Sequence, residues 1–237
     1  MPTWVEDTHL ANRLLTDMNT ELVQSGTERA KGIHVSQLIY CLTRSYYDQV
    51  SPLPLNPGET LLFSTGLGLE AVLLRPHRKA ATGETEGIHW SVDGLDYEEL
   101  TPLSEFKSTR LSANRGPEDL PATWVKQLLA YMYGTGEGEA ILAILHLMGS
   151  YAPPFPTLKC WHMYATKEEI QANWGWLQKR KKILEEHLAK GIQPKQFTYN
   201  EDWECTTGPC RYLLICQARQ SIEDLRKQLG EQAQTEA

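Results

Sequence analysis

The segment over residues 92–110 constrains the fold most, because charged and apolar residues alternate in it around an acidic turn. It predicts two short strands that pair as a hairpin, and the first strand ends at Asp93. The second strand carries Glu105, Phe106 and Lys107. Side chains alternate between the two faces of a strand, so Glu105 and Lys107 lie together while Phe106 points into the core. The hairpin brings Asp93 to the same end of the sheet.

Two carboxylates and an amine at one place fit a divalent-metal site. Carboxylate oxygens are hard ligands that suit Mg²⁺ or Mn²⁺. A lysine beside such an ion can orient or deprotonate a water, or stabilise the charge that develops on a phosphate. The alternative is that Glu105 and Lys107 form one of the many surface charge pairs found on solvated strands. Their spacing alone does not separate the two readings, so the rest of the chain decides.

The composition sets the class of protein. At 237 residues the chain is long enough for one domain with elaborations. A formal net charge of −7 is not typical of a nucleic-acid binder, although the basic run at residues 179–182 supplies local positive charge. No apolar run approaches the ~20 residues of a membrane helix, and residues 1–10 do not resemble a signal peptide. The sequence therefore predicts a cytoplasmic protein with no membrane partner.

Five cysteines in a chain without an export signal argue against a disulfide framework. Cys205, Cys210 and Cys216 are close in sequence, whereas Cys41 and Cys160 stand apart. Clustered cysteines in a reducing compartment are more often ligands of a metal or cluster than bridges. Taken alone, Cys41 is expected to be a small buried residue on a helix, and Cys160 is expected to lie in the core.

Hydrophobic periodicity predicts the remaining elements. An amphipathic helix is expected within residues 1–30, and a second helix, capped by Ser36, carries Cys41. A third helix over residues 64–74 carries Glu70, and its two glycines suggest close packing against a neighbour. Further along, the predicted elements are a helix over 122–136, a strand hairpin over 139–151 and 157–166, a helix over 167–190 and a final helix over 220–230.

The order of these elements and their polar residues resembles the PD-(D/E)XK nuclease superfamily, in its RecB-like branch, over residues 60–190. That branch carries the pattern G-x-x-x-H, then D, then E-x-K, then Q-x-x-x-Y. The matching positions here are Gly66 with Glu70, then Asp93, then Glu105 with Lys107, then Gln127 with Tyr131. Glu70 stands where the family has histidine, and Asp96 is the alternative to Asp93. The resemblance implies an α/β fold with a restriction-endonuclease-like core, in which helices flank a central mixed sheet.

The cysteines extend the resemblance to the iron–sulfur members of this branch, the CRISPR-associated Cas-four exonucleases and the AddB-type nuclease domains. By position, the implied ligands of a structural [4Fe–4S] cluster, far from the catalytic strands, are Cys41, Cys205, Cys210 and Cys216. Four cysteines can instead hold Zn²⁺. The resemblance divides the chain into an N-terminal helical region over residues 1–60, a nuclease core over 61–195, a cysteine-rich segment over 196–220, and a C-terminal helix and tail over 221–237.

The resemblance implies a DNA exonuclease that depends on Mg²⁺ or Mn²⁺ and acts on single-stranded DNA or DNA ends. Its implied catalytic residues are Lys107, Glu105, Asp93, Gln127 and Tyr131. Its implied metal ligands are Glu70, Asp93, Glu105 and the backbone carbonyl of Phe106. Its implied DNA contacts are Arg44 and Arg110. The alternative is a catalytically weak DNA-binding or assembly module in a complex of CRISPR adaptation or recombination proteins.

Overall fold

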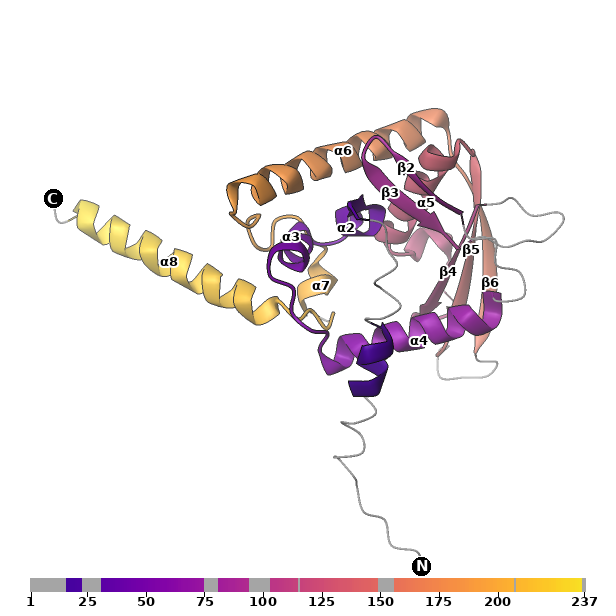
Figure 1. Cartoon of the computed structure of the whole chain (residues 1–237), viewed down its shortest axis with the longest axis horizontal. Helices are drawn as coiled ribbons and strands as arrows, with labels where there is room; N and C mark the ends of the chain where they lie inside the picture. The colour runs from indigo at the N-terminus through magenta and orange to yellow at the C-terminus, as the bar shows by residue number, and fades with distance from the viewer. Residues whose placement is uncertain are drawn as a thin grey trace, which may run out of the picture.

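The structure, a computed structural model, describes residues 16–22, 31–74, 81–93, 103–114, 116–148, 156–206 and 208–235. Within these ranges the chain forms an α/β fold in which helices surround two three-stranded sheets (Figure 1). Residues 16–22 are helical, and the rest of the helix expected within residues 1–30 lies outside the described residues. None of the helices in the described ranges has the length and apolar character needed to cross a membrane.

The first sheet is small and has the strand order β1-β3-β2. Its strands are β1 (Ile33–His34), β2 (Ala81–Thr85) and β3 (Ile88–Val92). β2 and β3 are antiparallel neighbours joined by Glu86 and Gly87, which both have positive φ. A two-residue loop with two positive φ values matches the right-handed twist of a hairpin. Glycine adopts a positive φ readily, which explains Gly87 at the second position.

The second sheet carries the residues of functional interest. It consists of β4 (Ser104–Thr109), β5 (Glu139–His146) and β6 (Thr157–Tyr164), in that order. β5 and β6 are antiparallel, which confirms the predicted hairpin, and β4 runs parallel to β5. The other predicted hairpin is wrong, because β3 and β4 lie in different sheets. The apolar central strand β5 is the partner of β4, and a parallel pair requires a crossover connection, which contains the helix α5.

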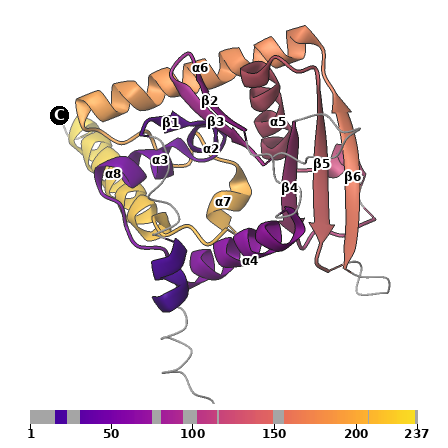
Figure 2. The ribbon, with the colours of Figure 1, turned by 45° about the vertical axis from the view of Figure 1, so that its right-hand side comes forward.

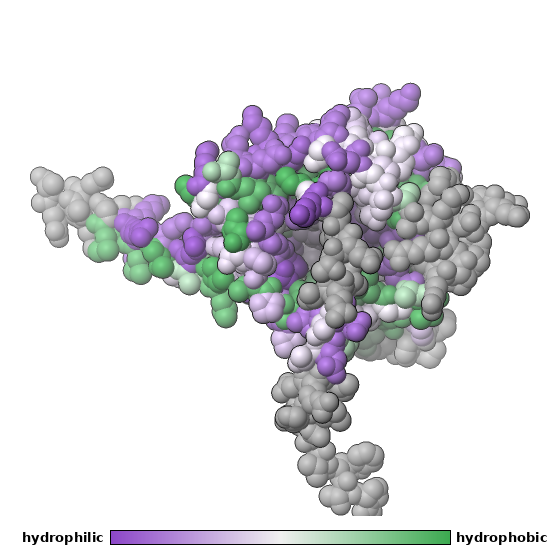
Figure 3. Space-filling view, viewed as in Figure 1, coloured by the Kyte–Doolittle hydropathy of each residue, from purple (hydrophilic) through white to green (hydrophobic). Residues whose placement is uncertain are grey.

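Seven helices of the described ranges carry labels in Figure 1. They are α2 (Val35–Ile39), α3 (Leu42–Val50), α4 (Pro57–Leu74), α5 (Ala122–Thr135), α6 (Lys167–Lys190), α7 (Asp202–Thr206) and α8 (Leu213–Thr235). α5 and α6 match their predicted ranges, and α6 begins with the capping box formed by Thr166 and Glu169. α4 and α8 begin earlier than predicted, and α8 extends away from the body with hydrophobic residues on its surface (Figure 3).

The single helix predicted after Ser36 is wrong. The chain forms two short helices that are separated by extended backbone at Tyr40 and Cys41. His34, rather than Ser36, precedes the first helix, and its backbone N–H donates to the side chain of Gln37 at 2.8 Å. Cys41 therefore lies at the start of α3 instead of within a helix.

Two glycines of α4, Gly66 and Gly68, do not pack closely against a neighbour as expected. A methyl group added at either position would meet no described atom within 4 Å, apart from the helix itself and adjacent residues. No other described element therefore packs closely against α4 at Gly66 and Gly68.

The larger of two hydrophobic clusters joins segments that are far apart in the sequence. It extends from Val35 in α2 to Tyr212 and Cys216 near the start of α8. Its centre lies where α5 packs against α6, with Leu128 and Leu177 fully buried. The residues of the predicted N-terminal region and cysteine-rich segment thus share one core with the second sheet.

Arg180 ties α6 to the break between α2 and α3. Its guanidinium donates to the carbonyl oxygens of Leu38, Tyr40 and Tyr199, the last at 2.9 Å, and lies over the Trp176 ring at 4.7 Å. Within the basic run at residues 179–182, Arg180 therefore has a structural role and is not available to bind a ligand.

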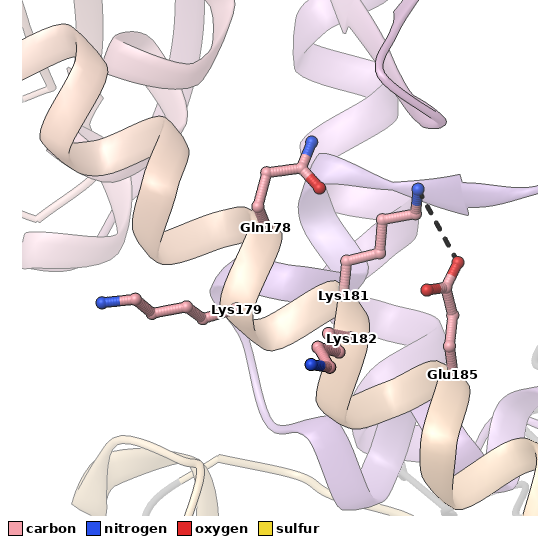
Figure 4. A pocket seen from close by; sticks show the side chains of 5 residues that line it. All are labelled: Gln178, Lys179, Lys181, Lys182 and Glu185. Atoms are coloured by element: carbon pink, nitrogen blue, oxygen red, sulfur yellow. Dashed lines mark ion pairs between the residues drawn. The ribbon is translucent and has the colours of Figure 1, made fainter.

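The neighbours of Arg180 on α6 face outward. Lys181 pairs with Glu185 at 3.7 Å, and its amine also donates to the carbonyl of Glu86 at 2.9 Å (Figure 4). Lys179 and Lys182 are exposed. The positive charge that the run offers to solvent is therefore smaller than its sequence suggests.

We expect Arg180→Ala to lower the free energy of unfolding by about 3 kcal/mol, because three carbonyls lose a charged donor at once. Chemical denaturation measures the change. Lys179→Ala, an exposed neighbour on the same helix, serves as the matched control and should change it by less than about 0.5 kcal/mol. Equal effects of the two substitutions would contradict the tie between α6 and the helix break.

Candidate functional site

Glu105 and Lys107 form a charge pair in the interior beside β4. Glu105 is 5% exposed, and the Lys107 amine donates to Glu105 Oε1 at 2.5 Å. On the opposite face of the strand, Phe106 packs with Ala143 of β5 and Leu69 of α4. The alternation predicted for these three consecutive residues is therefore confirmed, and the pair is not a solvated surface pair.

α5 supplies the groups that hold this pair in place. Gln127 Oε1 accepts from Lys107 at 2.9 Å, while its Nε2 donates to Glu105 Oε1 at 2.8 Å. The same Nε2 also donates to the hydroxyl of Tyr131 at 2.7 Å. Gln127 and Tyr131 are one helical turn apart and therefore share a face. The amide and the phenol of α5 together restrict the positions of both charged groups on β4.

Asp93 joins the site from the end of β3. Its Oδ2 accepts from the backbone N–H of Phe106 at 2.9 Å. Leu103 and Thr109 direct their carbonyls to β5, so by alternation Phe106 directs its N–H and C=O to the other edge of β4. The Phe106 carbonyl thus lies on the same edge as the Asp93 carboxylate. Asp96, the alternative acid, lies outside the described residues.

Burial and neighbouring acids control the protonation of the site. Burial raises the pKa of Glu105 to about 7, and repulsion from Asp93 and Glu70 adds to this, while Lys107 opposes it. Burial lowers the pKa of Lys107, but Glu105, Tyr40 and Asp93 outweigh that effect, so the net pKa is raised and the amine stays charged. The site thus holds several acids around one cation and gains from a further positive charge.

The donor set fits a hard divalent cation. Glu105 Oε2 is buried without a hydrogen-bond partner, which is a costly state for a carboxylate oxygen. Glu70 on α4 is near enough to influence Glu105 electrostatically. Among the described side chains, however, no three His, Cys, Asp or Glu residues already form a group that could hold a metal ion. The carboxylates would have to draw closer together to ligate one, as their oxygen chemistry allows.

A second candidate site is a cavity of about 570 Å³ that the four predicted cluster cysteines line. Cys41 comes from the helix break, while Cys205, Cys210 and Cys216 come from α7, the following turn and α8. Cys160 does not line this cavity, and it is exposed on β6. The prediction that Cys160 lies in the core is therefore wrong, because its position alternates onto the outer face of an edge strand.

The thiols of this cavity influence one another. Burial and the nearby Cys41, Cys210 and Cys205 together raise the pKa of Cys216 to about 12, while Arg219 opposes them. Burial also raises the pKa of Cys41, with a contribution from Glu204. The four thiols line one cavity, but among the described residues they do not already form a group that could hold a metal ion, so they would have to draw together around one. A thiolate-bound metal centre would compensate the charge of the deprotonated thiols. The donor set thus suits an iron–sulfur cluster or Zn²⁺.

Tyr40 and Glu204, which sequence analysis did not identify, connect the two sites. Tyr40 lines the cysteine cavity, and burial raises the pKa of its phenol, which Lys107, Glu105 and Glu204 also influence. Glu204 accepts from the backbone N–H of Cys41 at 2.9 Å. The cysteine cavity is therefore near Glu105 and Lys107 of β4 in space, contrary to the expectation from its distance in sequence. No local pattern marks either residue.

The two arginines predicted to contact DNA lie in different surroundings. Arg44 lines the cysteine cavity and pairs there with the buried Glu59 at 3.3 Å and with Asp48 at 3.9 Å. Arg211 pairs with the same two acids. Arg110 follows β4 directly and is exposed. The charge of Arg44 is thus already compensated, whereas Arg110 faces solvent at the end of β4.

Comparison with known proteins supports the fold and leaves the activity open. No protein-family model and no curated protein matches the chain. Among solved structures, the crystal structure of SSO0001 is similar, with a TM-score of 0.55 and 18% sequence identity. The similarity covers 87% of this chain and 96% of SSO0001. At this level of identity the likeness shows a shared α/β fold.

The raised pKa of Glu105 predicts a pH-dependent stability in metal-free protein. Its carboxyl is protonated more readily in the folded than in the unfolded chain. Its contribution to the free energy of unfolding is therefore full below pH 4.5, the ordinary pKa of a glutamate, and is lost as the pH rises to about 7. We expect the free energy of unfolding of the wild type, relative to Glu105→Gln, to fall by on the order of 3 kcal/mol across this interval. Denaturation of both proteins at several pH values tests this, and parallel curves would contradict it.

Proposed function

We propose that the protein is a metal-dependent nuclease that hydrolyses phosphodiester bonds in DNA. The observation that supports this most strongly is the buried contact between Glu105 and Lys107, held by Gln127 beside Asp93. A protein gains little stability from burying such a pair, since desolvation offsets the attraction between the charges. A catalytic role accounts for its retention. These are also the residues that carry the resemblance to the PD-(D/E)XK nucleases.

The proposed ligands of Mg²⁺ or Mn²⁺ are Glu70, Asp93, Glu105 and the carbonyl of Phe106. A divalent ion bound there would lower the pKa of a bound water and stabilise charge on the phosphate oxygens. Lys107 keeps its proton at neutral pH and offers N–H groups to an attacking water or a phosphate oxygen. Gln127 fixes the amine of Lys107 relative to Glu105, and Tyr131 fixes the amide of Gln127.

The arrangement of the second sheet supports a restriction-endonuclease-like core. The catalytic residues lie on β4, its partner β5 is parallel and buried, and α5 in the connection between them supplies Gln127 and Tyr131. β6 completes a mixed sheet, and α4, which carries Glu70, contacts β4 and runs across one end of it (Figure 2). Glu105 and Lys107 lie on a strand and Gln127 and Tyr131 on the helix of its crossover connection, as the family pattern requires, whereas Asp93 follows a strand of the other sheet.

We also propose that Cys41, Cys205, Cys210 and Cys216 hold a [4Fe–4S] cluster, with Zn²⁺ as the alternative. Their convergence on one cavity supports this assignment. The cluster would be structural, because it would join the helix break near the N-terminus to α7 and α8. Preferred substrates are single-stranded DNA or DNA ends, and partners are CRISPR adaptation or recombination proteins. The alternative function is a DNA-binding or assembly module of such a complex.

Lys107→Ala should keep the fold and reduce metal-dependent DNA cleavage by about 100-fold or more, because the amine and its contact with Glu105 are lost. The measurement is cleavage of end-labelled single and double strands with Mn²⁺ or Mg²⁺, and chelator should abolish it. Lys182→Ala, an exposed lysine on α6, is the control and should cleave like the wild type. Undiminished cleavage by Lys107→Ala would refute the catalytic assignment, and wild-type protein that binds DNA without cutting it would favour the assembly module.

The cysteine assignment has its own matched control within the chain. Cys210→Ala should lose the bound metal and a large part of the stability, because metal binding to such ligands contributes directly to folding. Cys160→Ser removes an exposed thiol outside the cavity and should retain both. Iron and sulfide analysis, visible absorbance and thermal melting of protein prepared without oxygen measure these effects. A colourless wild type that contains zinc would replace the cluster with the zinc alternative.

A further inference from the structure

The mouth of the cysteine cavity carries an unusual number of exposed aromatic side chains. Among the described residues four large aromatic side chains are exposed, namely Phe63, Tyr164, Phe197 and Trp203. All of them except Tyr164 line this one cavity. Phe63 comes from α4, Phe197 from the segment after α6, and Trp203 from α7. Three distant segments thus place exposed rings around a single opening, which we call the aromatic rim.

Phe197 is held in the rim at a conformational cost. Its φ is +56°, in the left-handed region, where a bulky side chain is rarely found. Such a conformation persists only where the surrounding structure enforces it, and it is enriched at ligand-binding sites. The side chain that this conformation presents is 43% exposed, so burial of the ring does not account for it. A ligand that covers the ring would account for both observations.

The rim leads toward the proposed catalytic site. The Trp203 ring meets Tyr40 edge to face, with a centroid distance of 6.3 Å. Tyr40 lines the cavity and is the electrostatic neighbour of Lys107 and Glu105. Tyr40 therefore stands between a ligand on the aromatic rim and the residues that are proposed to cleave a phosphodiester.

The charges of the cavity wall do not favour phosphate binding by attraction alone. The cavity contains Arg44, but this cation is paired with the buried carboxylate of Glu59. The whole chain has a formal net charge of −7. A nucleic acid bound here would be held mainly through its bases. Aromatic side chains stack on the bases of single strands with little sequence preference, whereas a duplex hides the faces of its bases.

We infer that Phe63, Phe197 and Trp203 form a base-stacking site for single-stranded nucleic acid that delivers the strand to the catalytic pair. The inference rests on the proposed nuclease function for the identity of the ligand. The rival explanation is that the aromatic rim shields a metal centre on the cysteines from water, as apolar surroundings of metal sites do.

The test measures the equilibrium dissociation constant of full-length protein for a labelled oligothymidylate, without added divalent metal so that the strand stays intact. Trp203→Ala and Phe197→Ala should each weaken binding about tenfold, the loss expected for one stacked base. Trp203→Phe keeps an aromatic ring and should retain most of the affinity. Phe197→Leu keeps an apolar side chain but has no aromatic ring, so it should lose affinity as Phe197→Ala does. Tyr164→Ala removes an exposed aromatic outside the cavity and should bind like the wild type.

An abasic strand of the same length separates stacking from other causes. It carries the same phosphates without bases, so the wild type and both alanine variants should bind it equally. The inference is overturned if the alanine variants bind oligothymidylate within about twofold of the wild type, or lose equal affinity for both strands. Loss of visible absorbance or melting temperature with intact binding also overturns it in favour of the shielding role. Cleavage assays are independent: a wild type that binds through the rim and never cuts refutes the nuclease proposal alone.

Discussion

The contact between Glu105 and Lys107 is the constraint on which the rest of the site depends. A buried carboxylate or ammonium is costly alone, so each of the two residues stabilises the charged form of the other. The contact in turn requires β4 to lie beside the buried strand β5 and α5 to face it with Gln127. Asp93 adds a carboxylate at the strand edge through the N–H of Phe106. The chain thus places acids from two separate segments beside one amine, with Glu70 of α4 acting on Glu105, and either a proton on Glu105 or a further positive charge relieves the repulsion among the acids.

The sequence predicted those helices and contacts that depend on residues close together in the chain. α6 begins at a capping box and ends at Gly191 in the left-handed conformation, so its boundaries follow from nearby residues. The spacing of Gln127 and Tyr131 on one helix face, and the alternation of Glu105 and Lys107 on one strand face, were likewise predictable because geometry within one element determines them. These local rules account for the contacts of Lys107 with Glu105 and of Gln127 with Tyr131, whereas the hydrogen bonds that join Gln127 and Asp93 to β4 depend on the packing of separate elements.

Features that depend on distant partners were not predictable in the same way. The pairing of β4 with β5 instead of β3 depends on burial of the central strand, which periodicity in residues 92–110 does not reveal. The helix expected after Ser36 breaks where Arg180, far along the chain, binds the carbonyls of Leu38 and Tyr40. Tertiary contacts override helix propensity at such points. Tyr40 was not identified from the sequence for the same reason, because its position between the two candidate sites depends on this break.

The break between α2 and α3 gives the two candidate sites a common physical basis. Tyr40 is the neighbour of the Glu105–Lys107 contact, and Cys41 lines the cysteine cavity. One peptide unit joins the two residues and fixes their Cα atoms about 3.8 Å apart, so a shift of one is transmitted to the other. Arg180 holds the backbone of this segment from one side, and Glu204 holds the N–H of Cys41 from another. A ligand that fixes the cysteines therefore also restrains Tyr40 beside Glu105 and Lys107, although the two candidate sites share no side chain among their proposed ligands.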